Sequence, residues 1–119
     1  MAKRFYVQRA PFKVPTTDGK SIREHFGLAS ALSDLSIAHM IAPPKWKEPF
    51  QTPEFDEYTF VIRGKKKFII DGQEIILNAG ESIKIKKGVR VQYSNPFDEE
   101  CEYLAICNPP FSLDLVNRE

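Results

Sequence analysis

Short hydrophobic runs, broken by glycine and proline turns, form the main pattern along this chain. The clearest run, residues 82–86, alternates strictly, so Ile83 and Ile85 face a core while Lys84 and Lys86 face water. The other runs are rich in β-branched and aromatic residues, as is typical of strands. The pattern predicts strands over residues 36–42, 58–63, 67–70, 73–77, 82–86, 89–94 and 102–107.

Tight turns separate the predicted strands. Asp71-Gly72 is the strongest hairpin signal in the chain, and Gly64-Lys65 also predicts a hairpin turn. Residues 21–26 fit either one turn of helix or a strand, and residues 112–116 predict a short helix with Ser112 as its N-cap. Many short strands joined by glycine turns favour a β-sandwich or a barrel.

Length and composition narrow the class of protein. The 119 residues suit one domain, and 42% hydrophobic with 28% charged residues indicates a globular chain. A formal net charge of +1 argues against a dedicated nucleic-acid binder. No apolar run approaches the roughly 20 residues of a membrane span, and no apolar stretch follows the charged N-terminus. We therefore expect no membrane association, no secretory signal and a cytoplasmic location.

The two cysteines, Cys101 and Cys107, are not expected to form a disulfide. On one extended strand, six residues apart, they would lie about 20 Å from each other. A disulfide needs Cα atoms within about 7 Å. We expect two buried free thiols.

Several spaced residues resemble the two motifs of the cupin superfamily. Glu57 and Gly64, with six residues between them, match the second half of the first motif. Gly80, Gly88 and Asn95 fall on the glycine and asparagine positions of the second motif. The region 36–107 therefore resembles a small single-domain, conserved-barrel cupin.

The resemblance implies an all-β fold, a jelly-roll β-barrel with at most short helical turns. It implies one domain over residues 1–119, with a core barrel over about 33–108. An N-terminal strand or hairpin arm would span 1–32, and a C-terminal tail would span 109–119. Cupins commonly form homodimers, and we expect one here, because pairing covers exposed strand edges.

The chain departs from the cupin pattern where metal ligands are expected. The two histidine positions of the first motif align with Gln51 and Pro53, and that of the second with Val91. Of the usual ligands only Glu57 survives, and cupin metals are held mainly by imidazoles. We expect no metal or other cofactor. An atypical divalent-metal site would need His25 or His39 together with Gln51, Asp56 or Glu57.

Two residues are candidates for catalysis. Glu57 would point into the barrel mouth, where a desolvated carboxylate suits a general base; alternatively it is a lip carboxylate paired with an arginine or a lysine. His39 shares a strand face with Ile37 and Ile41, which is either the core or the pocket wall. Some cupins act without metal through a histidine base, which makes Glu57 and His39 a candidate acid–base pair.

Four other residues are candidates for ligand binding. Gln51 occupies a former ligand position, and Trp46 and Phe50 lie near it in sequence. Tyr93 lies two residues beyond the missing third histidine, so its phenol would face the barrel interior. Each of these side chains could equally serve packing.

The remaining basic and polar residues have structural interpretations. We expect Asp56 to act as a turn or capping residue, and Asn95 to start a turn before Pro96. The basic residues are expected on a solvated face, and two of their segments would form one positive face if they lie on neighbouring strands. They are Arg63, Lys65, Lys66, Lys67, Lys84, Lys86, Lys87 and Arg90.

The sequence favours a small-molecule-binding barrel that lacks the histidine-rich metal site. One alternative is a metal-independent lyase, isomerase or epimerase that acts on a sugar or small carboxylate through Glu57 and His39. A second alternative is an atypical metallo-enzyme with Gln51 and Glu57 among its ligands. Whether the protein is an enzyme stays open at this point.

Overall fold

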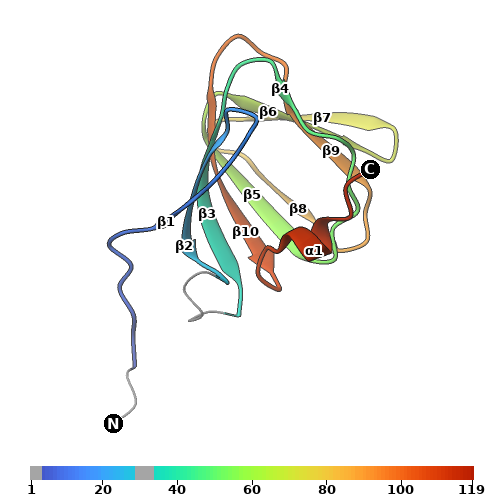
Figure 1. Cartoon of the computed structure of the whole chain (residues 1–119). Coiled ribbons are helices and arrows are strands. Elements are labelled where there is room, and N and C mark those ends of the chain that lie inside the picture. The colour runs from blue at the N-terminus through green and yellow to red at the C-terminus, as the bar shows by residue number, and fades with distance from the viewer. Residues whose placement is uncertain (1–3, 29–33) are drawn as a thin grey trace.

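A computed structural model describes residues 4–28 and 34–119 of the chain (Figure 1). The remaining residues, 1–3 and 29–33, lie outside the described part; they belong to the expected N-terminal arm and the start of the expected core barrel. Two antiparallel sheets enclose the interior. The fold is thus the all-β jelly roll that the sequence predicts.

One sheet has six strands in the spatial order β1-β2-β3-β10-β5-β8. Their bounds are β1 Phe12–Val14, β2 Ser21–Phe26, β3 Ser36–Ala42, β10 Cys101–Asn108, β5 Asp56–Arg63 and β8 Ser82–Ile85. The other sheet has four strands in the order β4-β9-β6-β7. Their bounds are β4 Trp46–Lys47, β9 Val91–Asn95, β6 Lys65–Ile70 and β7 Gln73–Asn78.

The barrel core lies between the sheets and follows from strand alternation. On β10, every second residue from Cys101 to Cys107 is buried, and the residues between them are only half-buried. Both cysteines are free, as predicted, because they share this one strand. The central cluster consists of Ala42, Trp46, Val61, Phe68, Leu77, Ile85, Val91, Tyr93, Cys101, Tyr103 and Ala105.

The predicted turns mostly form as expected. Asp71 and Gly72 both have positive φ, at 51° and 74°, and join β6 to β7 in a hairpin. Ile83 is half-buried and Ile85 is buried, while Lys84 and Lys86 are exposed.

The hairpin prediction at Gly64 is wrong. β5 lies in the six-stranded sheet and β6 in the four-stranded sheet, so Gly64 forms a corner between sheets. Its φ is 78°, and a Cβ there would lie 2.3 Å from the carbonyl oxygen of Glu100. Only glycine allows the chain to pass this close to Glu100, the residue directly before β10.

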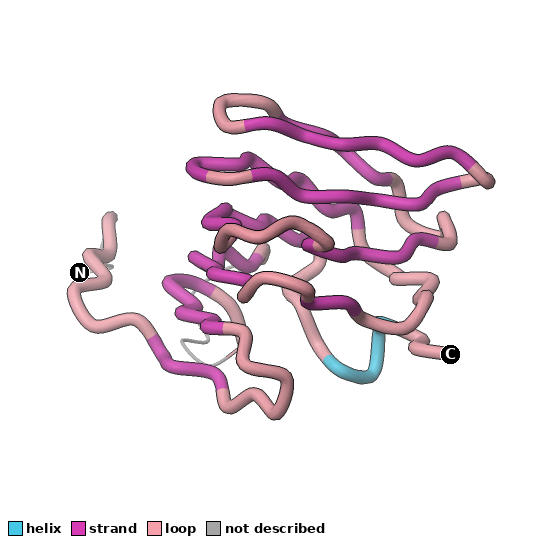
Figure 2. The backbone as a smooth tube through the Cα atoms, turned by 90° about the horizontal axis from the view of Figure 1, so that it is seen from above, coloured by secondary structure: helices cyan, strands magenta, loops and turns pink. Residues whose placement is uncertain are grey.

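The C-terminal end of the chain packs on the barrel, whereas the segment before β1 extends away from it (Figure 1). Residues 21–26 form strand β2, which settles the helix-or-strand alternative, and β1 pairs with it. Helix α1, Leu113–Val116, begins at Ser112, whose hydroxyl accepts a hydrogen bond from Asp114 N at 3.3 Å. The helix, cyan in Figure 2, places Val116 in a small cluster with Phe55 and Cys107.

Asn95 and Asp56 have the structural roles expected of them. Asn95 is fully buried, and its amide donates to the carbonyl oxygens of Pro43 at 3.0 Å and Glu99 at 2.8 Å. Asp56 accepts a hydrogen bond from Lys87 N at 2.9 Å. Within the described residues, no helix is long and apolar enough to cross a membrane.

Candidate functional site

A cavity of about 80 Å³ lies inside the barrel, between the two sheets. Apolar side chains such as Met40, Phe55 and Ala105 form much of its wall. The polar groups that face it come from separate parts of the chain. They include Lys20, Glu48, Gln51, Glu57, Lys66 and Tyr93.

Four of the six candidate residues from the sequence line this cavity: Trp46, Gln51, Glu57 and Tyr93. Gln51 exchanges two backbone hydrogen bonds with Val91, of 2.9 and 2.8 Å. Two positions that align with cupin histidines therefore lie side by side, and one of them, Gln51, lines the cavity.

His39 does not reach the cavity. Its neighbours on β3, Ala38 and Met40, line the cavity, so alternation turns His39 to the outer face of the sheet. There its Nε2 lies 2.6 Å from Glu102 Oε2. This contact lowers the pKa of the Glu102 carboxyl. The prediction that His39 and Glu57 form an acid–base pair is therefore wrong, because they lie on opposite sides of the sheet.

Phe50 also lies outside the cavity lining. The guanidinium of Arg90 lies 3.9 Å from the centroid of its ring. Arg90 in turn forms an ion pair with Glu119, with Nη2 2.8 Å from Oε1. The prediction that Phe50 walls the ligand pocket is therefore wrong; its ring helps to hold the C-terminal tail against the barrel.

Lys66 is the residue that differs most from expectation. It was expected on a solvated basic face, yet it is only 3% exposed and lines the cavity. Its Nζ lies 3.6 Å from the ring centroid of Tyr103 and 4.8 Å from that of Tyr93. Burial lowers the pKa of Lys66 to about 8, although the nearby Glu57 carboxylate acts in the opposite direction.

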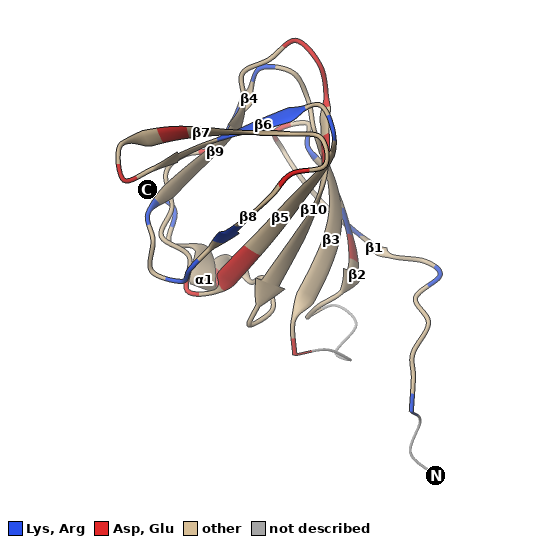
Figure 3. Ribbon diagram, turned by 180° about the vertical axis from the view of Figure 1, so that it is seen from behind, with Lys and Arg blue, Asp and Glu red and all other residues tan. Residues whose placement is uncertain are grey.

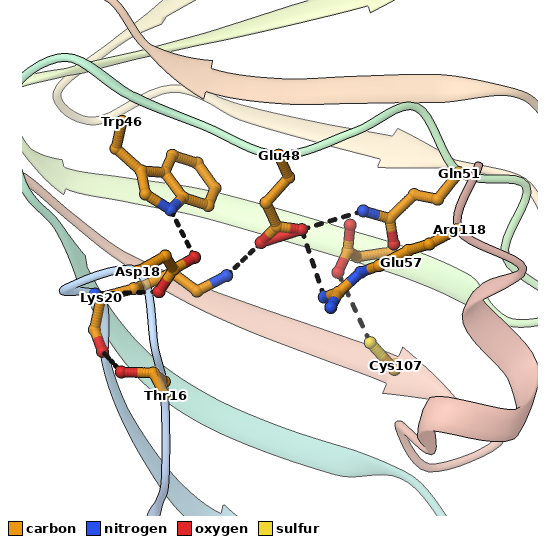
Figure 4. A network of polar contacts seen from close by, with 9 residues as sticks. All are labelled: Thr16, Asp18, Lys20, Trp46, Glu48, Gln51, Glu57, Cys107 and Arg118. Carbon is orange, nitrogen blue, oxygen red and sulfur yellow. Dashed lines mark hydrogen bonds and ion pairs between the residues drawn. The ribbon is translucent and has the colours of Figure 1, made fainter.

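Glu57 is held in an incomplete set of contacts. Its Oε2 accepts a weak hydrogen bond from the Cys107 thiol at 3.6 Å (Figure 4). Its Oε1 is buried and has no hydrogen-bond partner among the described residues. Burial, and then the Glu57 charge, raise the pKa of Tyr93 well above its ordinary value and likewise raise that of Cys107. Both groups therefore stay protonated at neutral pH.

A second carboxylate, Glu48, is fully paired (Figure 4). It forms a buried ion pair with Lys20, and both residues are 7% exposed. Its other oxygen accepts from Gln51 Nε2 at 2.9 Å and from Arg118 Nη2 at 3.3 Å. Removing one member of such a buried pair typically costs about 3–5 kcal/mol. We assign Glu48 a structural role, because it ties the N-terminal strands and the C-terminal tail to the barrel.

The loop before β2 completes this network. Trp46 Nε1 donates to Asp18 Oδ2 at 2.7 Å, and Lys20 Nζ lies 4.5 Å from the Trp46 ring centroid. Burial raises the pKa of Asp18, but its hydrogen bonds from Trp46 and the Lys20 backbone outweigh that effect, and the net pKa is lowered. Trp46 is therefore fixed in place at the cavity wall.

The donor set does not fit a transition metal. Gln51 and Glu57 supply one amide and one carboxylate, while Val91 has no donor in its side chain. The part of the chain that the structure describes contains no group of three or more His, Cys, Asp or Glu that could hold a metal ion. The metallo-enzyme alternative is therefore not supported by the residues at the site.

The basic residues do not form one positive face. Lys65 and Lys67 lie on β6 of the four-stranded sheet, whereas Lys84 lies on β8 of the six-stranded sheet (Figure 3). These strands are not neighbours, so the prediction of a single face is wrong.

Sequence comparison identifies the family. Residues 38–107 match the cupin domain family, so the chain belongs to the cupins, as the spacing of its motifs predicted. The match ends at Cys107, the thiol that contacts Glu57 in the cavity.

Two named proteins are similar to this chain in sequence. A Myxococcus xanthus protein named endoribonuclease YbeY is 39% identical over 107 residues, which is 89% of this chain and 36% of that protein. A Clostridioides difficile protein named acetate kinase EutQ is 42% identical over 45 residues, 38% of this chain and 29% of that protein. The chain thus spans about a third of the length of these relatives.

The polyketide cyclase RemF from Streptomyces resistomycificus has the same fold. It superposes with a TM-score of 0.75 at 15% identity and covers 99% of this chain, which covers 85% of RemF. At so low an identity, the superposition shows that the two proteins share a fold and shows nothing about a shared function.

Sequence reasoning missed Lys20, Glu48 and Lys66. For Lys66 a signal exists: it shares a strand face with Phe68 and Ile70, both apolar, so period two places it inside. The contact between Lys20 and Glu48 could not be predicted in this way, because it joins a loop to a residue that follows a two-residue strand.

Proposed function

We propose that the barrel binds a small polar organic ligand, of the size of a short carboxylic acid or carbonyl compound, without help from a metal. The observation that carries this proposal is a pair of incompletely satisfied charged groups facing one cavity. These groups are the Glu57 carboxylate, with Oε1 unpartnered among the described residues, and the Lys66 ammonium. Buried charges without full partners are costly, and a ligand that completes their contacts offsets that cost.

Charge and size define the ligand class. Glu48 is neutralised by Lys20 and Arg118, which leaves Lys66 free to pair with a carboxylate or to contact a carbonyl oxygen. A cavity of about 80 Å³ suits a few non-hydrogen atoms better than a sugar. The C. difficile relative is named an acetate kinase, and acetate is a carboxylate of this size.

Entry to the cavity is available on the side of the C-terminal tail. Arg118 lines the cavity and is 40% exposed, so the lining extends to the surface there. The half-buried Ile22 and Phe111 also line the cavity.

A thermal-shift series with acetate, propionate, pyruvate and acetaldehyde tests the proposal. We expect at least one compound to raise the Tm of the wild type, because binding to the folded state stabilises it. The Glu57→Gln variant keeps the shape of the side chain. The same compound should shift its Tm by a different amount from that of the wild type. The proposal fails if none of the four compounds shifts the Tm at concentrations that leave the baseline stable.

We also propose that two copies associate through the outer face of the six-stranded sheet. Tyr58, Phe60 and Ile62 on β5 are each more than 40% exposed there. Leu104 and Ile106 of β10 continue the same apolar surface. Apolar surface of this kind on central strands is characteristic of an interface, and a second copy presents an equal apolar face.

A further inference from the structure

The Lys66 side chain extends across the barrel interior towards the opposite sheet. The residue lies on β6 in the four-stranded sheet, while Tyr103, whose ring centroid is 3.6 Å from Nζ, lies on β10 in the opposite sheet. Aromatic faces of Tyr103, Tyr93 and Phe68 surround the amine. Within residues 4–28 and 34–119, no hydrogen bond or ion pair engages Nζ.

We propose that Lys66 forms an imine with a small aldehyde or 2-oxo acid that enters the cavity. This proposal rests on the proposed function, namely that the cavity admits a small ligand. Two features of the geometry carry it: the unpaired amine lines the cavity, and the Glu57 carboxylate with its unpartnered Oε1 lines the same cavity. A buried amine that shares a cavity with a carboxylate able to accept its proton suits imine formation.

The chemical steps balance within the cavity. The Lys66 ammonium gives one proton to Glu57, and its nitrogen then attacks the carbonyl carbon, which opens the C=O π bond. The nitrogen loses a second proton to the new alkoxide, and Glu57 returns its proton to the resulting hydroxyl. The C–O bond breaks, water leaves, and the C=N bond carries the positive charge. Ammonium and carbonyl compound thus become protonated imine and water, without any oxidant or reductant.

Lys66 differs from the other lysines of the chain in ways that favour this reaction. Lys20 also faces the cavity, but it is engaged in the buried pair with Glu48. Lys65, beside Lys66 in sequence, is exposed, and Lys67 pairs with Glu74 at 2.8 Å. With a pKa of about 8, roughly a tenth of Lys66 is neutral at pH 7, against less than about 0.1% for an ordinary lysine.

Reductive trapping tests the proposal. The protein is incubated at neutral pH with pyruvate or with acetaldehyde in the presence of cyanoborohydride, and modified lysines are located by peptide mass spectrometry. We expect modification of Lys66 at a rate at least about tenfold above that of Lys65 and Lys67, which serve as internal controls. Modification of surface lysines with Lys66 left intact would overturn the proposal.

Two variants separate the roles of the residues. Lys66→Met should abolish the fast-forming adduct while circular dichroism shows a retained fold. Glu57→Gln should slow trapping at Lys66 by about tenfold or more, because the proton acceptor is lost, with no change at Lys65. An unchanged rate in Glu57→Gln would refute the proton-transfer role of Glu57.

The outcome is distinguishable from that of the proposed function. If pyruvate raises the Tm without reductant and no Lys66 adduct forms, the cavity binds its ligand and the imine proposal is wrong. If pyruvate and acetaldehyde neither shift the Tm nor modify Lys66, both proposals fail for these compounds. A Lys66 adduct supports both.

Discussion

Lys66 combines a charge with a buried position, and the two conflict energetically. The aromatic rings and the Glu57 carboxylate offset part of the lost hydration, yet the lowered pKa of about 8 indicates that the charged form remains disfavoured. Relative to the ordinary value of 10.5, this corresponds to about 3 kcal/mol. Such a cost is more readily understood for a residue that serves a ligand than for one that only packs.

Replacing Lys66 by methionine should therefore stabilise the protein at pH 7, by about 1–3 kcal/mol. Below pH 8 the lysine is charged in both the folded and unfolded states, so its full burial cost is present. Between pH 8 and 10.5 the folded state has released the proton while the unfolded state still binds it, so wild-type stability rises relative to the variant. The gain from Lys66→Met should thus shrink across this range, as measured by urea unfolding at several pH values.

The exposed neighbour provides the control for this prediction. Lys65→Met alters a surface lysine on the same strand and should change the unfolding free energy by less than about 0.5 kcal/mol at every pH. A Lys66→Met variant that is less stable than wild type at pH 7 would show that the ammonium stabilises the fold.

At the residue scale, motif spacing and strand alternation predicted that Glu57, Gln51 and Tyr93 face the cavity, because both are local rules. Trp46 was proposed only because it lies near Gln51 in sequence. The prediction that His39 lies at the site was wrong for a related reason. Alternation grouped it correctly with Ile37 and Ile41, but did not indicate which face of β3 was inside. That choice depends on pairing with β10, whose inward residues are Tyr103 and Ala105.

At the scale of elements, the corner at Gly64 determines how the barrel closes. The sequence predicted the strands on both sides of it but treated the connection as a hairpin. A hairpin and a corner between sheets both need a residue with positive φ, so the glycine alone does not distinguish them. The difference lies in which strands pair, and this is decided by contacts far along the chain.

Gly64→Ala should destabilise the protein more than a matched glycine substitution elsewhere. Its Cβ would meet the Glu100 carbonyl oxygen at 2.3 Å, and the positive φ adds strain. At Gly72, which has a similar φ of 74°, a Cβ would meet nothing within 4 Å. We expect Gly72→Ala to cost about 1 kcal/mol and Gly64→Ala to cost clearly more, measured by urea unfolding. Equal costs would show that the corner can relax.

At the scale of the whole molecule, the cavity and the outer face are on opposite sides of the six-stranded sheet. β10 contributes Ala105 and Cys107 to the cavity and Leu104 and Ile106 to the outer apolar surface. The proposed ligand binding and the proposed association would therefore use different side chains of one strand. A substitution on one face of the sheet therefore makes no direct contact with the side chains of the other face.

Light scattering should give a mass of twice the 13.7 kDa chain if two copies associate as proposed. Phe60→Lys places a charge in the proposed interface and should shift the protein towards the monomer. Ile76→Lys, which alters a residue 45% exposed on β7 of the other sheet, should leave the mass unchanged. A monomeric wild type at micromolar concentrations would contradict this interface.

The central claim is that the barrel interior is the ligand site, and it is tested most directly by filling that interior. Ala105→Leu extends an apolar side chain from β10 into the cavity lining and leaves the outer face intact. Calorimetric titration with pyruvate should give binding heat for the wild type and none for folded Ala105→Leu. Equal affinity of the two proteins for pyruvate would contradict the account, because the ligand would then bind somewhere other than the cavity.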